Sequence, residues 1–199
     1  MNLTHKLFTP ALVLLLALLG VGMNCPPGPD VTHRLQIRRY ITSSMTDVRA
    51  DKILADMTEI LQTNDGPGDV ACSVGFTRDG NVTPFTTGNG IINSAADFTA
   101  VNGLAGDVKI VNQINWCGAI MPNVISCIEP AGNSFLVVRV AGSSEAHLWL
   151  HDFGLVKGLP FRNDANAVMG GFGVNNRRVT EAECDVFSST AALIPVTAK

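Results

Sequence analysis

Several features that the chain lacks exclude whole classes of protein. It contains no Cys-x-x-Cys pair, which argues against a zinc ribbon and against a thioredoxin-type redox site. No basic cluster is larger than the pairs Arg38-Arg39 and Arg177-Arg178, and the net charge is −3, so we expect no nucleic-acid partner. The glycine-rich segment 170–173 is not a phosphate cradle, because no strand leads into it and no lysine follows. The sequence also has no internal repeat and no low-complexity tract.

The N-terminal segment has the layout of a secretory signal. A short polar stretch that contains Lys6 precedes an apolar run from Ala11 to Val21, which is too short to span a bilayer comfortably. We therefore expect residues 1–24 to be a signal peptide and the protein to be secreted or part of the cell envelope.

The sequence allows two ways of processing this signal. Gly20 and Gly22 suit ordinary signal cleavage, whereas Cys25 would be the attachment point of a lipid that tethers the protein to a membrane. Residues 25–33 are proline-rich and are predicted to be a linker, and residues 34–199 have the usual size of one domain with one hydrophobic core.

Export permits disulfide bonds, and the chain has five cysteines. If Cys25 is lipidated or free, the other four form an even set, for which three pairings exist. We prefer the pairing that closes one loop containing proline and glycine and ties a strand to the last helix. These bonds would join Cys117 to Cys127 and Cys72 to Cys184.

The hydrophobic pattern predicts three helices and several strands. Apolar residues at helical spacing predict an amphipathic helix over 46–61, and a second helix starts at 143–145 and ends near Lys157 with Gly158 as its C′ residue. Thr180 and Glu183 form a capping box at the start of a last short helix. Short apolar segments over 35–41, 73–76, 90–92, 108–114 and 135–140 indicate strands. This order favours an α/β or α+β fold with one twisted mixed sheet.

The segment from His151 to Met169 carries the most informative pattern. It resembles the metzincin zinc endopeptidase signature H-E-x-x-H-x-x-G-x-x-H with a methionine turn downstream. By this resemblance His151 stands at the first ligand position, Asp152 at the general-base position, Gly158 at the turn and Met169 at the methionine turn. The resemblance implies a single metzincin-like domain over 34–199, with an N-terminal helix, a motif helix and a C-terminal helix.

Two ligand positions of the motif have lost their histidines. Leu155 stands where the second histidine belongs and Phe161 where the third belongs, and neither side chain has a lone pair for zinc. Asp152 is also one methylene shorter than the family's glutamate, and a misplacement of about 1 Å can cost about a hundredfold in rate. We therefore expect an inactive pseudo-metallopeptidase without a cofactor, in which Leu155 and Phe161 act as apolar plugs.

This interpretation predicts a polypeptide partner, bound in a retained cleft by pairing with an edge strand beside the motif helix. One alternative is an active zinc metallopeptidase with non-standard ligands. His147 lies four residues before His151 on the same helical face, and a carboxylate would have to complete such a site. The candidate carboxylates are Glu145, Asp152 and Asp164. A second alternative is a structural module of the envelope or the secreted fraction.

Overall fold

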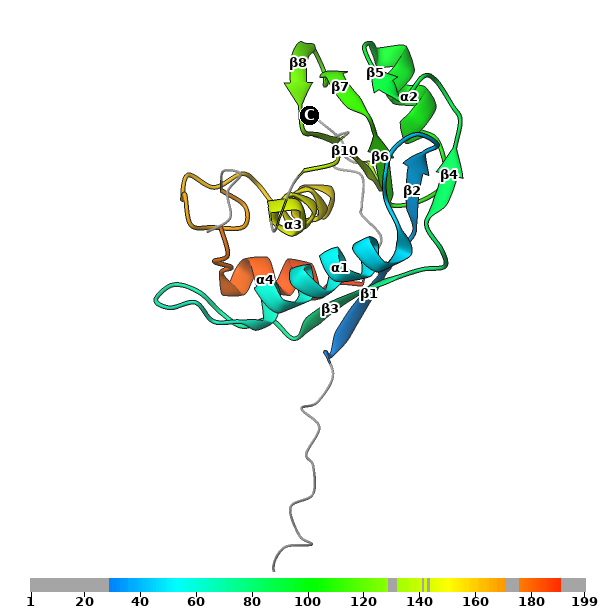
Figure 1. Ribbon diagram of the computed structural model, residues 1–199. Helices are drawn as coiled ribbons and strands as arrows, with labels where there is room; N and C mark the ends of the chain where they lie inside the picture. The colour runs from blue at the N-terminus through cyan, green and yellow to red at the C-terminus, as the bar shows by residue number, and fades with distance from the viewer. Residues whose placement is uncertain (1–28, 129–131, 141, 143, 171–175, 191–199) are drawn as a thin grey trace, which may run out of the picture.

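The computed structural model describes residues 29–128, 132–140, 142, 144–170 and 176–190. The predicted signal segment, Cys25 and Ser143 lie outside these residues. The described chain is of the α+β kind, with helices and strands mixed along the sequence (Figure 1).

A five-stranded mixed sheet forms the centre of the molecule. Its strand order is β4-β2-β6-β10-β9, and only the edge strand β9 is antiparallel to its neighbour. Val108 and Ile110 of β6 point to one face of the sheet and Lys109 and Val111 to the other, as the period of two requires. The strands are β2 (Ile37–Tyr40), β4 (Thr83–Phe85), β6 (Val108–Val111), β9 (Ser126–Ile128) and β10 (Phe135–Val138).

The first strand starts earlier than the sequence pattern predicts. β1 (Val31–Leu35) pairs in parallel with β3 (Val74–Arg78), and β2 follows after Gln36, so one extended segment contributes to two sheets. The predicted linker 25–33 is therefore wrong at its C-terminal end, because residues 31–33 already belong to a strand. The expectation of one sheet is also wrong, since the described residues form three.

The third sheet and a short helix fill the middle of the sequence. β5 (Ile91–Ile92), β7 (Gln113–Trp116) and β8 (Ile120–Val124) form this sheet, and α2 (Ala95–Asn102) lies beside it. The sequence pattern gave no helix here because α2 has only Phe98 and Val101 as buried residues, which is too few for a visible helical period.

The three predicted helices are confirmed, with both ends of the first two and the start of the last within one or two residues of the prediction. They are α1 (Asp47–Gln62), α3 (Ser144–Val156) and α4 (Glu181–Ser188). Thr46 caps α1 by accepting a hydrogen bond from the Arg49 amide, and the predicted capping box of Thr180 and Glu183 starts α4. Each cap satisfies amide groups that the helix itself leaves without partners.

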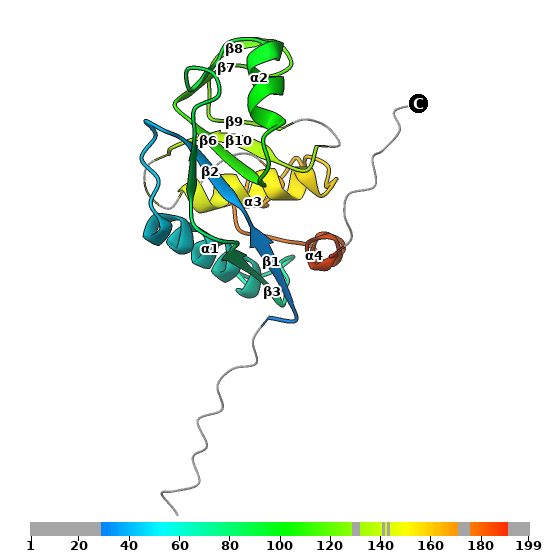
Figure 2. The same cartoon turned by 90° about the vertical axis from the view of Figure 1, so that its right-hand side faces the viewer.

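Two layers cover the central sheet. α1 and α3 lie on one side of it, while α2 and the sheet of β7 and β8 lie on the other, as Figure 2 shows most directly. The larger core cluster contains Leu54, Met57 and Trp149 of the helices together with inward residues of β2, β6 and β10. The smaller cluster joins Phe98 to Val111 and Leu136. The sheet thus separates α3 from the α2 side of the molecule.

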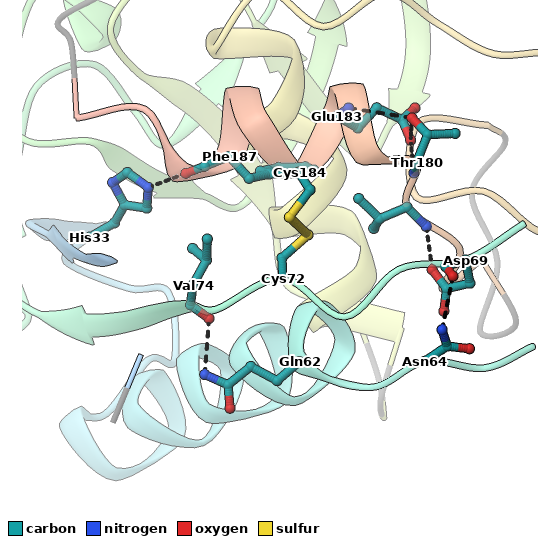
Figure 3. The surroundings of a disulfide bond; sticks show 11 residues. His33, Gln62, Asn64, Asp69, Cys72, Val74, Thr180, Glu183, Cys184 and Phe187 are labelled. Carbon is teal, nitrogen blue, oxygen red and sulfur yellow. Dashed lines mark hydrogen bonds between the residues drawn. A yellow bond between two sulfur atoms is a disulfide. The ribbon is translucent and has the colours of Figure 1, made fainter. Parts of the chain in front are cut away.

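Both disulfides of the preferred pairing are present. Cys117 is bonded to Cys127, and Cys72, just before β3, is bonded to Cys184 of α4 (Figure 3). His33 of β1 adds a second tie to α4, because its Nε2 donates to the Phe187 carbonyl at 2.6 Å (Figure 3). Two disulfides suggest an oxidising, extracellular environment. None of the helices in the described part of the chain is long and apolar enough to cross a membrane.

Candidate functional site

Helix α3 and the loop after it form the candidate site. The helix ends in a Schellman motif: the Gly158 amide donates to the Leu155 carbonyl at 2.9 Å and the Leu159 amide to the Gly154 carbonyl at 3.0 Å. Gly158 has a φ of +83°, which a side chain would strain. The chain therefore reverses at the residue that the pattern predicts for the turn.

The reversal brings Phe161 against His151. Their ring centroids lie 5.5 Å apart with the planes at 78°, which is an edge-to-face contact. The Arg162 amide next to Phe161 donates to the Met169 carbonyl at 2.7 Å, so the loop closes on itself. The first and third ligand positions of the motif, ten residues apart in the sequence, are thus neighbours in space.

The orientation of the His151 ring is fixed by the segment around Met169. His151 Nδ1 lies 2.8 Å from the Val168 carbonyl oxygen. Because a carbonyl can only accept, Nδ1 carries the proton, and the neutral ring then has its lone pair on Nε2. A histidine that holds a metal through Nε2 is commonly oriented in this way by a backbone carbonyl.

Met169 packs beneath the helix. Its side chain is fully buried, and its Sδ would lie 2.4 Å from a Cβ added at Gly154. Glycine within a helix costs about 1 kcal/mol relative to alanine, so the close approach of Met169 gives a physical reason for Gly154. Glycine inside an apolar helix is the sequence signal of such a close approach.

The prediction that Phe161 acts as an apolar plug is wrong. Leu155 is half-buried and packs against the main core, but Phe161 is 66% exposed. The loop holds Phe161 at the surface. Its ring contacts the ring of His151, and most of the side chain faces solvent. The apolar replacements therefore differ: Leu155 joins the core, and Phe161 leaves an exposed aromatic ring beside His151.

Asp152 points into the sheet side of α3 and is only 2% exposed. Its Oδ1 accepts a hydrogen bond from the Ser126 hydroxyl of the edge strand β9 at 3.1 Å, while Oδ2 has no partner among the described residues. Burial raises the pKa of this carboxyl well above its ordinary value, and the hydrogen bond from Ser126 opposes this effect. A neutral carboxyl cannot take up a proton, so this arrangement does not suit a general base.

His147 lies in different surroundings from His151. Its Nδ1 donates to the Asn176 carbonyl at 3.2 Å, and it lines a cavity of about 210 Å³ together with Glu59 and Arg177. Burial lowers the pKa of His147, and the Asn176 carbonyl partly offsets this. The imidazole faces α1 and its ion pairs.

The carboxylates considered as further ligands are engaged elsewhere. Glu145 is buried between Arg49 and Arg139, with N–O distances of 2.8 and 2.7 Å, and Asp164 pairs with Arg162 at 3.1 Å. The described residues contain no group of three or more His, Cys, Asp or Glu side chains that could hold a metal ion.

The edge strand β9 completes the site. One side of β9 pairs with β10, and α3 packs against the sheet there, as the hydrogen bond between Ser126 and Asp152 shows. Sequence reasoning missed β9 and Ser126, because a strand of three residues, with the disulfide-bonded Cys127 at its centre, gives almost no periodic pattern.

Neither a protein-family model nor a curated protein matches the chain.

Proposed function

We propose that this protein is an exported, metzincin-like pseudo-peptidase that binds a polypeptide and does not hydrolyse it. The observation that carries the proposal is the contact of His151 with Phe161, above the buried Met169. The ring of Phe161 lies beside His151, where a zinc site of this kind would need the imidazole of a third histidine. With Leu155 at the remaining ligand position, one histidine is left of the three.

The energetics of zinc binding support the loss of metal. A catalytic zinc site uses three protein ligands, and well-built sites bind with about 10 kcal/mol or more. Leu155 and Phe161 contribute no lone pair, and the neutral form of Asp152 that its burial favours would not activate a water.

Polypeptide binding is proposed for the side of β9 that pairs with no strand in the described part of the chain. An edge strand presents unpaired amide and carbonyl groups that an extended peptide can join as a further strand. β9 is the last strand of its sheet, and α3 packs against it. Phe161, whose ring is exposed, comes shortly after α3 in the sequence. Main-chain hydrogen bonds would supply affinity there without regard to sequence, and apolar side chains would be favoured near Phe161.

The scaffold is tested by restoring the histidines. We expect the double variant Leu155→His, Phe161→His to hold about one zinc per chain after dialysis, measured by elemental analysis, whereas the natural protein holds none. Neither substitution buries an unpaired imidazole, because Leu155 is half-buried and Phe161 exposed. The matched control is Ile120→His, Met121→His, which adds two exposed imidazoles on β8. Stoichiometric zinc in the natural protein, or equal zinc in both variants, would contradict the proposal.

Binding and hydrolysis are separated with fluorescently labelled, unfolded casein. The proposal predicts a saturable rise in fluorescence anisotropy without cleavage. Cleavage that disappears with a chelator and with His151→Ala would instead establish the alternative, an active peptidase that uses His147 and His151. Absence of both binding and cleavage would favour a structural module.

Export and tethering are proposed from the N-terminal segment. We expect the mature chain to lack residues 1–24, and a lipid at Cys25 would appear as an added acyl mass on the N-terminal peptide. Mass spectrometry of the protein recovered from the cell envelope and from the medium distinguishes the tethered form from the freely secreted one.

A further inference from the structure

A second cavity lies away from α3, at the amino ends of the parallel strands β2, β6 and β10. Its volume is about 620 Å³, within the range of small-molecule sites. Gln36, Asp107 and Ser134, which immediately precede these three strands, line it together with Asn102 and Lys109. In Figure 2 this end of β6 lies below α2. The cavity is thus built by the sheet and by the last turn of α2.

Lys109 is an unusual residue at the wall of this cavity. It is only 1% exposed, and it lies on the face of β6 that turns toward α2, opposite Leu136 of β10. Its Nζ donates to the carbonyl oxygen of Asn102, the last residue of α2, at 3.2 Å. That contact is favourable because the C-terminal end of a helix attracts a cation.

The positive charge of Lys109 has no close counter-ion in the part of the chain that the structure describes. Within the described ranges, no carboxylate oxygen lies within 4.0 Å of its Nζ. Asp107 attracts it from a longer distance, but Asp107 Oδ2 already accepts the Gln36 amide at 2.7 Å. Burial lowers the pKa of Lys109 to about 8, against the attraction of Asp107. An ammonium has three donors, and the described residues provide an acceptor for one of them.

The rest of the wall limits what could supply the missing charge. Asp79 and Asp107 both line the cavity; Asp79 is paired with Arg34 at 3.0 Å, but no lysine or arginine of the described residues lies within 4.0 Å of the Asp107 carboxylate, which would repel a dianion such as phosphate. The carboxylate of Asp107, with Asp79 beside it at the wall, suits an ammonium group. The buried Ser134 hydroxyl, bonded to Asn102 Oδ1 at 2.7 Å, and the exposed Asn133 add neutral polar groups.

We propose that this cavity binds a small free amino acid, with its carboxylate on Lys109 Nζ and its ammonium group toward Asp107 and Asp79. A carboxylate at Lys109 would form a charge-assisted hydrogen bond with an ammonium group that is itself buried. The ligand thereby provides a counter-ion where the described residues provide none within 4.0 Å. This site lies across the sheet from α3 and is independent of the proposed peptide binding.

The probes are glycine and serine, with acetate and inorganic phosphate for comparison, titrated into the isotopically labelled protein. We expect saturable shifts of the amide resonances of Asp107, Asn133 and Ser134 with glycine and serine, and weaker binding of acetate and phosphate. Lys109→Met should weaken glycine binding about tenfold or more, since a charged hydrogen bond is lost. The matched control Lys52→Met changes an exposed lysine that pairs with Asp56, and should bind glycine as the natural protein does.

A second measurement needs no variant. Glycine binding to the natural protein should weaken as the pH rises through about 8, where the Lys109 ammonium loses its proton. Affinity that does not change over this range, glycine binding that survives Lys109→Met in a folded variant, or tighter binding of phosphate than of glycine would each overturn the proposal. Absence of any saturable shift with glycine and serine would overturn it as well.

Discussion

Asp152 shows how far one residue's surroundings can depart from what its place in a motif suggests. The motif places it at the catalytic position, but the α3 helix turns it toward the sheet, where Ser126 is its partner. Burial of a carboxyl without a cation favours the neutral form. The residue then lowers the stability of the folded protein at neutral pH, because the unfolded chain is free to ionise it.

The first prediction concerns the pH dependence of stability in Asp152→Asn. Folding raises the pKa of Asp152 above its ordinary value of 3.8, so the folded protein retains a proton that the unfolded chain releases. The contribution of Asp152 to stability is therefore greatest below 3.8 and falls as the pH rises toward the folded-state pKa. Asparagine does not titrate. Urea unfolding should show the variant gaining stability relative to the natural protein as the pH rises above 3.8 toward the folded-state pKa.

Asp51→Asn is a control with the opposite sign. A hydrogen bond from Arg78 lowers the pKa of Asp51, so this carboxylate stabilises the folded state above its ordinary pKa. Asp51→Asn should therefore be less stable than the natural protein by a small, constant amount above pH 3.8, small because Asp51 is exposed to solvent, and the difference should shrink only as the pH falls below 3.8. A flat difference for Asp152→Asn would show that the carboxyl is not held neutral.

At the scale of elements, Glu145 joins the start of α3 to two other parts of the fold. Its carboxylate is buried and accepts hydrogen bonds from Arg49 of α1 and from Arg139 after β10. Arg139 also donates to the Ser44 carbonyl ahead of α1. The negative charge of Glu145 in the first turn of α3 also interacts favourably with the helix dipole. The motif helix is thus fixed at its N-terminus by charge and at its C-terminus by Gly158.

We predict that Glu145→Gln lowers the free energy of unfolding by about 1.5 to 3 kcal/mol, measured by urea unfolding at neutral pH. The amide keeps the shape of the side chain, but its nitrogen faces a guanidinium group where an oxygen accepted before. Asp79→Asn, which affects the exposed pair of Asp79 with Arg34, should cost less than about 1 kcal/mol. Equal losses in the two variants would mean that the buried pair adds nothing beyond a surface one.

At the scale of the whole molecule, the two disulfides restrain loops of very different length. The bond between Cys72 and Cys184 joins residues 112 positions apart, whereas the bond between Cys117 and Cys127 spans 10. The longer loop ties α4 to the segment before β3. A crosslink restricts the unfolded chain more strongly when its loop is longer.

The chain-entropy relation predicts different losses for the two bonds. Cys72→Ser with Cys184→Ser should lower the free energy of unfolding by about 4 to 5 kcal/mol, and Cys117→Ser with Cys127→Ser by about 2 to 3 kcal/mol. Urea unfolding of the two double variants under the same conditions measures both. A larger loss from the short loop would show that local packing around β7 and β9, and not loop closure, governs stability.

The sequence by itself determined the features that depend on local physics. The caps Thr46, Thr180 and Gly158 define helix ends because their side chains, or the lack of one, satisfy nearby backbone groups. The spacing from His151 to Met169 indicated a helix, a reversal and a second approach to the helix, and the contacts of Phe161 and Met169 follow that course. The preferred cysteine pairing, one of three, is the one present.

Only the tertiary structure decided what depends on residues far apart in the sequence. The strand order, the division into three sheets and the edge position of β9 arise from long-range pairing, which a local pattern does not encode. The burial of Asp152 against Ser126 and the exposure of Phe161 follow from the way that α3 docks on the sheet. Lys109 reads as an ordinary charged residue in a strand until the sheet and α2 enclose it, because desolvation is a property of the assembled fold.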